Sequence, residues 1–421
     1  MRILIKNVTI IDPNSSFHNK KKDVFIADGI IQKIGDHLEE EQAQLIEEEN
    51  LHISPGLFDF RATFGEPGKE TKEDLVSGAK AAQLGGFTGV SISPNTLPTI
   101  SNRSTVEYIL NRSNDFLVDL HPIGSISQNI EGKELAELYD MKQAGAVAFS
   151  DGKKAIQNSS LLSRALLYSK PFEGLIISFA NDKNINHNGQ VNEGIVSTNL
   201  GLESIPHLAE EIQISRDLYL AEYNSSPIHF ATISSAKTVE LIKKAKENKI
   251  AVTTDIAAHQ LMFTDESTTD FDANYKVLPP YRLEKDINAL IKGLKDNTIS
   301  VICSDHTPVE IEDKDREFDL AKFGIINLQT AFPSMLTKLV PQLGLELVIQ
   351  KMAIEPRKIL KLPIPILQEK EKANFVLYNP AQKWIFKKED VVSKSKNTPY
   401  INYEFTGKVY GVFNNSKLNI N

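Results

Sequence analysis

The feature that most constrains this chain is a regular alternation, from Gly56 onward, of short apolar β-like runs with amphipathic helical segments. Such alternation is typical of a parallel α/β sheet or barrel. Eight runs have strand character, and eight is the number of strands in a (β/α)8 barrel. The expected strands are residues 56–60, 87–93, 117–124, 146–150, 174–180, 227–231, 250–256 and 299–305.

Amphipathic segments between these runs predict helices, several of which end at Gly or Asn as helices commonly do. They include residues 71–85, 132–145, 203–223 and 235–248, with two more helices between residues 325 and 352.

Both ends of the chain have strand character. The first 55 residues are short β-like runs joined by polar turns, and residues 373–386 and 407–415 return to this pattern. We therefore expect an α/β fold in which a (β/α)8 TIM barrel carries a small composite β-sandwich from both termini. The expected units are residues 1–55 and 364–421 for the two parts of the sandwich and residues 56–363 for the barrel.

Composition narrows the function. The 421 residues are 41% hydrophobic, enough for a large core, and the formal net charge is -8. Nucleic acids and anionic membranes are bound by clustered Lys and Arg, so neither is expected as a partner. The first residues alternate like a strand and lack the features of a signal peptide, and no window approaches the roughly 18 apolar residues of a membrane span. We expect a cytoplasmic protein.

Eight short motifs stand in the order and spacing of type I dihydroorotases, and together they cover most of the chain. They are SPGLFD (54–59), EPG (66–68), GGFT (85–88), PNTLP (94–98), SDGK (150–153), SDHTP (304–308), FGI (323–325) and KSKNTP (394–399). The chain thus resembles a type I dihydroorotase of the amidohydrolase superfamily. The resemblance implies a TIM barrel of the metal-dependent hydrolase type, a role in pyrimidine biosynthesis, and a zinc site at the C-terminal mouth of the barrel that hydrolyses a cyclic amide.

The chain departs from the family pattern at the implied metal ligands. Where the family has His-x-His on the first strand, this chain has Arg61 and Thr63 around Ala62. The histidine positions on the fifth and sixth strands are Phe179 and Thr232. A guanidinium has no lone pair for a metal and repels cations. The resemblance therefore implies a metal site that has lost most of its ligands.

Three carboxylates remain at family positions. By resemblance, Asp151 is the bridging ligand, Asp305 is both a ligand and the proton-transfer base, and Asp59 belongs to the first strand. Without a metal-bound water, an aspartate with a pKa near 3.9 is a poor base. Asp305 is thus the predicted catalytic residue of a degenerate site.

Substrate contacts are implied for Asn95 and His259. Other substrate contacts of the family are replaced in this chain. Gly65 occupies the position of an arginine that would hold the substrate carboxylate. Leu278 occupies the position of an asparagine, and Val309 that of a histidine.

Two functions follow. The first is a non-catalytic dihydroorotase relative, without a cofactor. For such a relative, the family resemblance implies homo-oligomers and a role as structural or regulatory partner of aspartate carbamoyltransferase. The alternative is a working dihydroorotase or related cyclic amidohydrolase with a reduced zinc shell of Asp151, His229, His259 and Asp305.

The charges near these positions suggest further expectations. Arg61 is expected to pair with Asp151 or Asp305, because two buried carboxylates without a cation would be costly. Lys153 and its neighbour Lys154 are expected to face solvent. Asp305 and His306 are expected to anchor a loop.

Overall fold

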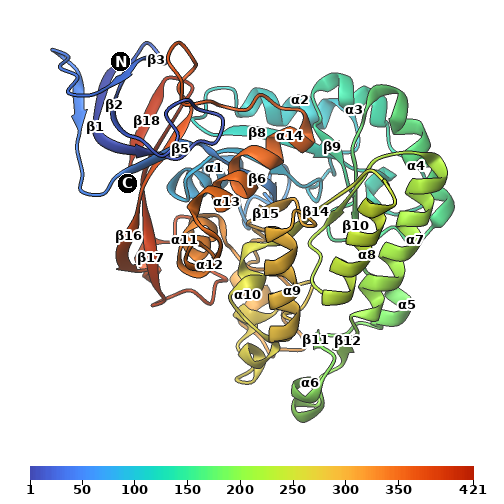
Figure 1. Cartoon of the computed structure of the whole chain (residues 1–421). Coiled ribbons are helices and arrows are strands. Elements are labelled where there is room, and N and C mark those ends of the chain that lie inside the picture. The colour runs from blue at the N-terminus through green and yellow to red at the C-terminus, as the bar shows by residue number, and fades with distance from the viewer.

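The barrel expected from the sequence is confirmed by a computed structural model that describes residues 1–421. Eight parallel strands follow one another around the sheet in chain order (Figure 1). All eight expected runs contribute a strand. They are β6 (Leu57–Ala62), β7 (Phe87–Ile92), β8 (Asp119–Gly124), β9 (Ala148–Phe149), β10 (Ile176–Phe179), β13 (Ile228–Ala231), β14 (Val252–Ala257) and β15 (Val301–Cys303).

Hydrogen bonds just beyond β15 bring the last strand back to the first. The Ser304 backbone N–H donates to Asp59 of β6 at 2.6 Å. The Thr63 N–H donates to the His306 carbonyl at 2.8 Å. The barrel is nearly closed by these contacts.

Helices pack around the barrel (Figure 1). Those expected from the sequence are α1 (Leu75–Leu84), α3 (Leu138–Ala144), α7 (Leu208–Asn224), α8 (Ala236–Glu247), α11 (Leu328–Lys338) and α13 (Leu345–Ile349). The remaining helices are α2 (Arg103–Arg112), α4 (Ser159–Ser169), α5 (Lys183–Asn186), α6 (Ile195–Leu200), α9 (Glu284–Lys295), α10 (Ile311–Lys314), α12 (Val340–Leu343) and α14 (Glu355–Leu360). None of the helices combines the length and apolar character that a membrane crossing requires.

Two helices differ from their expected extent. Helix α3 begins only at Leu138, because residues 132–134 form bends and Leu135 pairs with Ser127 in an isolated β-bridge. Helix α7 begins at Leu208, because Ser204 and Ile205 form the short strand β12, which pairs with β11 (Val191–Asn192).

Strands from both termini form one continuous sheet beside the barrel (Figure 1). The N-terminal strand β5 pairs antiparallel with β16, so that Pro55 lies opposite Phe375. The other strands extend the sheet on either side of this junction. The sheet contains β1 (Arg2–Ile10), β2 (Lys21–Ala27), β3 (Ile30–Gly35), β4 (Gln44–Ile46), β5 (His52–Pro55), β16 (Phe375–Ile385), β17 (Glu404–Asn414) and β18 (Lys417–Ile420).

The terminal sheet has an apolar core of its own. Sixteen buried residues, from Ile3 to Phe413, form a cluster separate from the 63-residue cluster of the barrel and its helices. Because both termini supply this smaller core, neither terminal segment can bury its apolar face alone. The exact boundaries after residues 55 and 363 stay a prediction.

We predict that Phe375→Ala strongly destabilises the protein. The Phe375 ring stacks on Phe413 at a centroid distance of 5.3 Å, and both side chains are fully buried. Removing a buried phenylalanine costs about 3–5 kcal/mol of unfolding free energy. Urea denaturation measures this loss. The matched control is Ile385→Ala in the same strand, where the side chain is exposed. Equal effects of the two substitutions would contradict the assignment of Phe375 to a shared core.

Candidate functional site

The candidate site lies at the C-terminal ends of the barrel strands. Arg61 stands near the end of β6, Asp255 lies in β14, and Asp305 follows β15. All three side chains are buried. Lys153 reaches the same place from the loop after β9. Two carboxylates and two cationic side chains therefore meet in the barrel mouth.

Arg61 forms the centre of this cluster. Its Nη2 atom lies 3.1 Å from Asp305 Oδ1 and 3.7 Å from Asp255 Oδ1. The same atom donates to the Thr232 hydroxyl, whereas Nε and Nη1 have no hydrogen-bond partner. Burial disfavours the charged guanidinium, but Asp255 and Asp305 outweigh this and raise the pKa of Arg61. Arg61 thus pairs with Asp305, one of its two expected partners, and not with Asp151.

Lys153 corrects an expectation. Its Nζ lies 2.6 Å from Asp305 Oδ2 and donates to the Leu278 carbonyl at 2.8 Å. Only 22% of its side chain is exposed. Lys153 therefore points into the mouth rather than into solvent, because the buried Asp305 attracts a second cation. Lys154 is exposed as expected.

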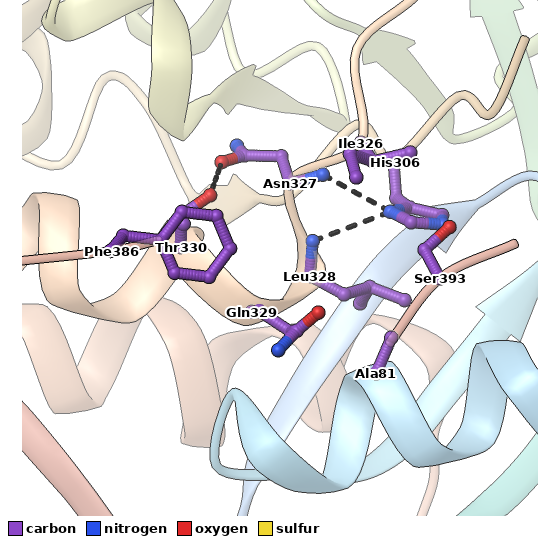
Figure 2. Close-up of a pocket in the computed structure, with 9 residues that line it drawn as sticks. All are labelled: Ala81, His306, Ile326, Asn327, Leu328, Gln329, Thr330, Phe386 and Ser393. Carbon is purple, nitrogen blue, oxygen red and sulfur yellow. Dashed lines mark hydrogen bonds between the residues drawn. The ribbon is translucent and has the colours of Figure 1, made fainter. Parts of the chain in front are cut away.

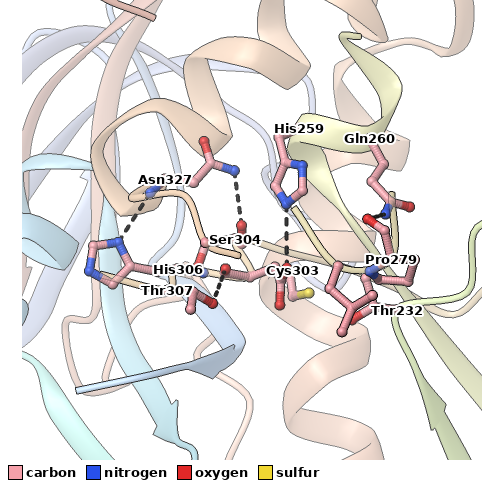
Figure 3. A network of polar contacts seen from close by, with 12 residues as sticks. Thr232, His259, Gln260, Pro279, Cys303, Ser304, His306, Thr307 and Asn327 are labelled. Carbon is pink, nitrogen blue, oxygen red and sulfur yellow. Dashed lines mark hydrogen bonds and ion pairs between the residues drawn. The ribbon is translucent and has the colours of Figure 1, made fainter. Parts of the chain in front are cut away.

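Asp305 is held in its ionised form. Its carboxylate contacts Arg61 and Lys153. His259, which is labelled in Figure 3, has its Nε2 atom 3.4 Å from Asp305 Oδ2. Burial alone would raise the pKa of Asp305, but Lys153, His259 and Arg61 hold it well below its usual range. A carboxylate with so low a pKa is a weak proton acceptor.

His229 and His259 are both fully buried, but they serve different neighbours. His229 Nδ1 lies 2.8 Å from Thr253 Oγ1, and Nε2 lies 3.0 Å from Asp255 Oδ2. The ring also stacks on Phe60. Both ring nitrogens of His229 are therefore engaged in hydrogen bonds. His259, by contrast, has an unpartnered Nδ1.

Asp151 and Asp59 have partners of their own. Asp151 accepts the backbone N–H groups of Ile126 and Ser127, each at 2.9 Å, and the Ser127 hydroxyl. Asp59 accepts the backbone N–H and hydroxyl of Ser304. Burial raises the pKa of Asp59 to about 7 despite these bonds. Both carboxylates thus fasten loops of the barrel mouth.

The donor set at the mouth does not fit a zinc ion. No group of three or more His, Cys, Asp and Glu side chains is placed to hold a metal. A structural or catalytic zinc needs at least three such protein ligands in one shell. The reduced zinc shell of Asp151, His229, His259 and Asp305 is not assembled. Asp151 and His229 form hydrogen bonds with other neighbours, and Arg61 contacts the Asp305 carboxylate.

The other positions implied by the resemblance are mostly structural here. Phe179 is buried at the end of β10. The Thr232 N–H donates to Asp255 at 2.7 Å, and its hydroxyl accepts from Arg61. Thr63 and Asn95, in contrast, line a pocket of about 160 Å³ at the mouth. Asn95 thus borders a space that could hold a ligand.

Asp255 is the site residue that sequence reasoning missed. It accepts from His229, from the Thr232 N–H and from the Cys303 thiol at 3.5 Å, and it contacts Arg61. A single acidic residue inside the apolar strand of residues 250–256 was the available signal. Buried acids are rarely found without a charged or hydrogen-bonding partner.

His306 acts as the expected loop anchor and points away from the mouth cluster. Its Nδ1 accepts the backbone N–H groups of Asn327 at 3.1 Å and Leu328 at 3.4 Å (Figure 2). Its Nε2 lies 3.4 Å from the buried Glu73. The ring therefore ties the loop after β15 to the start of α11.

Comparison with known proteins identifies the family. The chain is 40% identical to a dihydroorotase of Syntrophus aciditrophicus, in an alignment that covers 97% of each protein. It is also 40% identical to a dihydroorotase of Caldicellulosiruptor saccharolyticus, with 99% of this chain and 98% of that protein covered. The chain belongs to the dihydroorotase family. The family described as Dihydro-orotase-like matches residues 51–238.

Solved structures of other members of the fold support the architecture of this dihydroorotase-family chain. An L-hydantoinase (dihydropyrimidinase) from Arthrobacter aurescens superposes with a TM-score of 0.85 at 20% identity, covering 99% of this chain and 95% of that one. A dihydropyrimidinase from Brevibacillus agri gives 0.83 at 18% identity, with 100% and 95% covered. At these identities the likeness shows the shared barrel fold.

We predict that Asp305→Asn destabilises the protein in a pH-dependent way. The substitution leaves Arg61 and Lys153 without their shared carboxylate, and breaking a buried ion pair costs about 3–5 kcal/mol. The folded-state pKa of Asp305 is depressed, so its stabilisation is present above the unfolded pKa of about 3.9 and is lost as pH falls below it. Urea denaturation from pH 3 to pH 8 measures the effect.

The difference in unfolding free energy between wild type and Asp305→Asn should thus be constant at neutral pH and shrink below about pH 4. Asp315→Asn, which changes an exposed aspartate, serves as the control. A difference that stays constant down to pH 3 would show that Asp305 is not held ionised by its neighbours.

Proposed function

We propose that this protein is a non-catalytic member of the dihydroorotase family that acts in pyrimidine synthesis, in the cytoplasm, as a structural or regulatory partner of aspartate carbamoyltransferase. The observation that carries the proposal is the pairing of Arg61 with Asp305 in the barrel mouth. This contact turns the carboxylate that would bind metal and move a proton into one half of an ion pair.

Charge in the mouth opposes a catalytic metal. Zinc assists hydrolysis by lowering the pKa of a bound water and polarising a carbonyl. A divalent ion beside Asp305 would face both Arg61 and Lys153. Two like unit charges 4 Å apart repel by about 4 kcal/mol at an effective dielectric constant near 20, and a dication doubles this for each cation. The residues present therefore favour their own salt bridges over a metal.

The remaining groups give no substitute mechanism for cyclic amide hydrolysis. Asp305 is a weak base because its pKa is held low. His229 is engaged at both ring nitrogens. Asp59 is bonded to Ser304 and takes no part in the pocket. None of these three side chains is free to activate water, and His259, whose Nδ1 is unpartnered, has its Nε2 beside the ionised Asp305.

The second candidate is an active dihydroorotase, and the names of the relatives support it more directly than they support the non-catalytic role. Those relatives are dihydroorotases that align over nearly the whole chain. Asn95, His259 and Asp305 also keep the positions implied by resemblance. For this candidate to hold, Arg61 and Lys153 must leave Asp305 when substrate and zinc bind.

Metal content and turnover decide between the two candidates. We predict that protein purified without chelator contains no stoichiometric zinc and hydrolyses dihydroorotate no faster than background, with or without added zinc. Elemental analysis and a dihydroorotate hydrolysis assay measure this. The control is Asp305→Asn, which should leave the background rate unchanged. About one or two zinc ions per chain, with turnover that depends on zinc in the wild-type protein, would establish the active enzyme instead.

The partner role makes a separate prediction. Mixed with the aspartate carbamoyltransferase of the same organism, the protein should form a complex of higher mass or change the rate of the transferase. Size-exclusion chromatography with light scattering measures the mass, and the chain alone serves as the reference for its own homo-oligomer. Unchanged mass and unchanged transferase rate would contradict the partner role while leaving the zinc result intact.

A further inference from the structure

A small basic pocket at the barrel mouth is lined by residues that follow Arg61 and Asp305 in the chain, among them Thr63 and Thr307. We call it the mouth pocket. It has a volume of about 160 Å³, and its lining includes Lys69, Lys72, Lys322, Thr63 and Asn95. A water molecule takes up about 30 Å³ in the liquid, so the pocket has room for a small group of a few heavy atoms. The space suits one small ion or one end of a metabolite.

The mouth pocket carries unbalanced positive charge. Lys322 forms a salt bridge with Asp313 at 2.6 Å. Lys69 donates to the Asn95 carbonyl at 3.0 Å and forms no salt bridge, and the Lys72 ammonium has neither a hydrogen bond nor a salt bridge. Three ammonium groups thus face one carboxylate, which leaves two positive charges without a counter-charge.

The electrostatic effect of this arrangement appears at Lys69. Burial lowers the pKa of Lys69, and the nearby ammonium groups of Lys72 and Lys322 lower it further. The three cations therefore repel one another in the structure. An anion placed among them would relieve that repulsion.

Neutral hydrogen-bonding groups complete the lining. The side-chain amide of Asn95 and the hydroxyl of Thr63 form no hydrogen bond within the protein, although both residues are partly buried. An oxyanion accepts hydrogen bonds from amides, hydroxyls and ammonium groups alike. Charge and unused donors thus point to the same class of ligand.

The turn from Gly65 to Lys69 brings Lys69 to the mouth pocket. The Lys69 N–H donates to the Gly65 carbonyl at 2.9 Å in a tight turn. A Cβ atom at position 65 would lie only 1.9 Å from the Lys69 carbonyl oxygen. No side chain fits at position 65 in this turn, so the positive charge beside it in the mouth pocket belongs to Lys69.

We propose that the mouth pocket binds the phosphate group of a small metabolite or free inorganic phosphate. A phosphate ester carries about −1.5 to −2 charge at pH 7, which matches two uncompensated ammonium groups, whereas a single carboxylate carries only one charge. Lysine is also an established phosphate ligand as a point charge. The assignment needs neither zinc nor turnover nor a protein partner, so it stands or falls separately from the proposed function.

Isothermal titration calorimetry with inorganic phosphate, at constant ionic strength set by NaCl, tests the proposal. Saturable binding is expected, with acetate weaker than phosphate at the same concentration. The double variant Lys69→Met, Lys72→Met should weaken phosphate binding about tenfold or more, because it removes two charge-assisted contacts. Glycerol 3-phosphate binding as tightly as inorganic phosphate would identify a phosphate ester as the ligand, and weaker binding would identify free phosphate.

The matched control is Lys80→Met, Lys244→Met, which removes the same net charge from two exposed lysines outside the pocket. It should bind phosphate like wild type. Circular dichroism and the melting temperature in the absence of phosphate confirm that both double variants are folded. Absence of saturable binding, equal binding of acetate, or equal loss in the two double variants would overturn the proposal.

Discussion

The ion pair between Arg61 and Asp305 decides what the barrel mouth can do. A guanidinium buried between two carboxylates neutralises charges that would otherwise make the folded state costly. The side chains around Arg61 are arranged to match its charge. Thr232 accepts from it, Asp255 shares it, and Lys153 supplies the second positive charge that Asp305 can hold. The charged groups of the mouth are therefore paired mainly with one another.

The barrel mouth has two regions that differ in how their charges are paired. Around Arg61 the positive and negative groups are paired and buried, whereas the mouth pocket keeps ammonium groups without counter-charges. The paired region stabilises the fold, and the unpaired region is poised for a ligand. A barrel mouth of this kind can keep the family's shape while it changes the kind of molecule that enters it.

Much of the fold was predictable because it depends on local patterns. Each apolar run of the barrel is buried on both faces, so it stands out from the amphipathic helices that follow it. The extent of α3 was not predictable, because the bridge between Ser127 and Leu135 is a backbone pairing that helical periodicity does not reveal. In the site, the pairing of Arg61 with Asp305 was predictable, because buried carboxylates need a nearby positive charge. The roles of Lys153 and Asp255 were not predictable, because they depend on side chains that only the closed barrel brings together.

The pairing of β5 with β16 joins segments from opposite ends of the chain. During synthesis, β5 leaves the ribosome long before its partner exists. Until the C-terminal strands arrive, the edge of β5 and the apolar face behind it are open to pairing with other chains. Loss of the last fifty or so residues, by a premature stop or by proteolysis, would thus do more than shorten the protein. It would leave the edge of β5 unpaired and would also remove Val376, Tyr378, Val409 and Val412 from the core of the barrel, so that the stability of the barrel depends on strands made long after it.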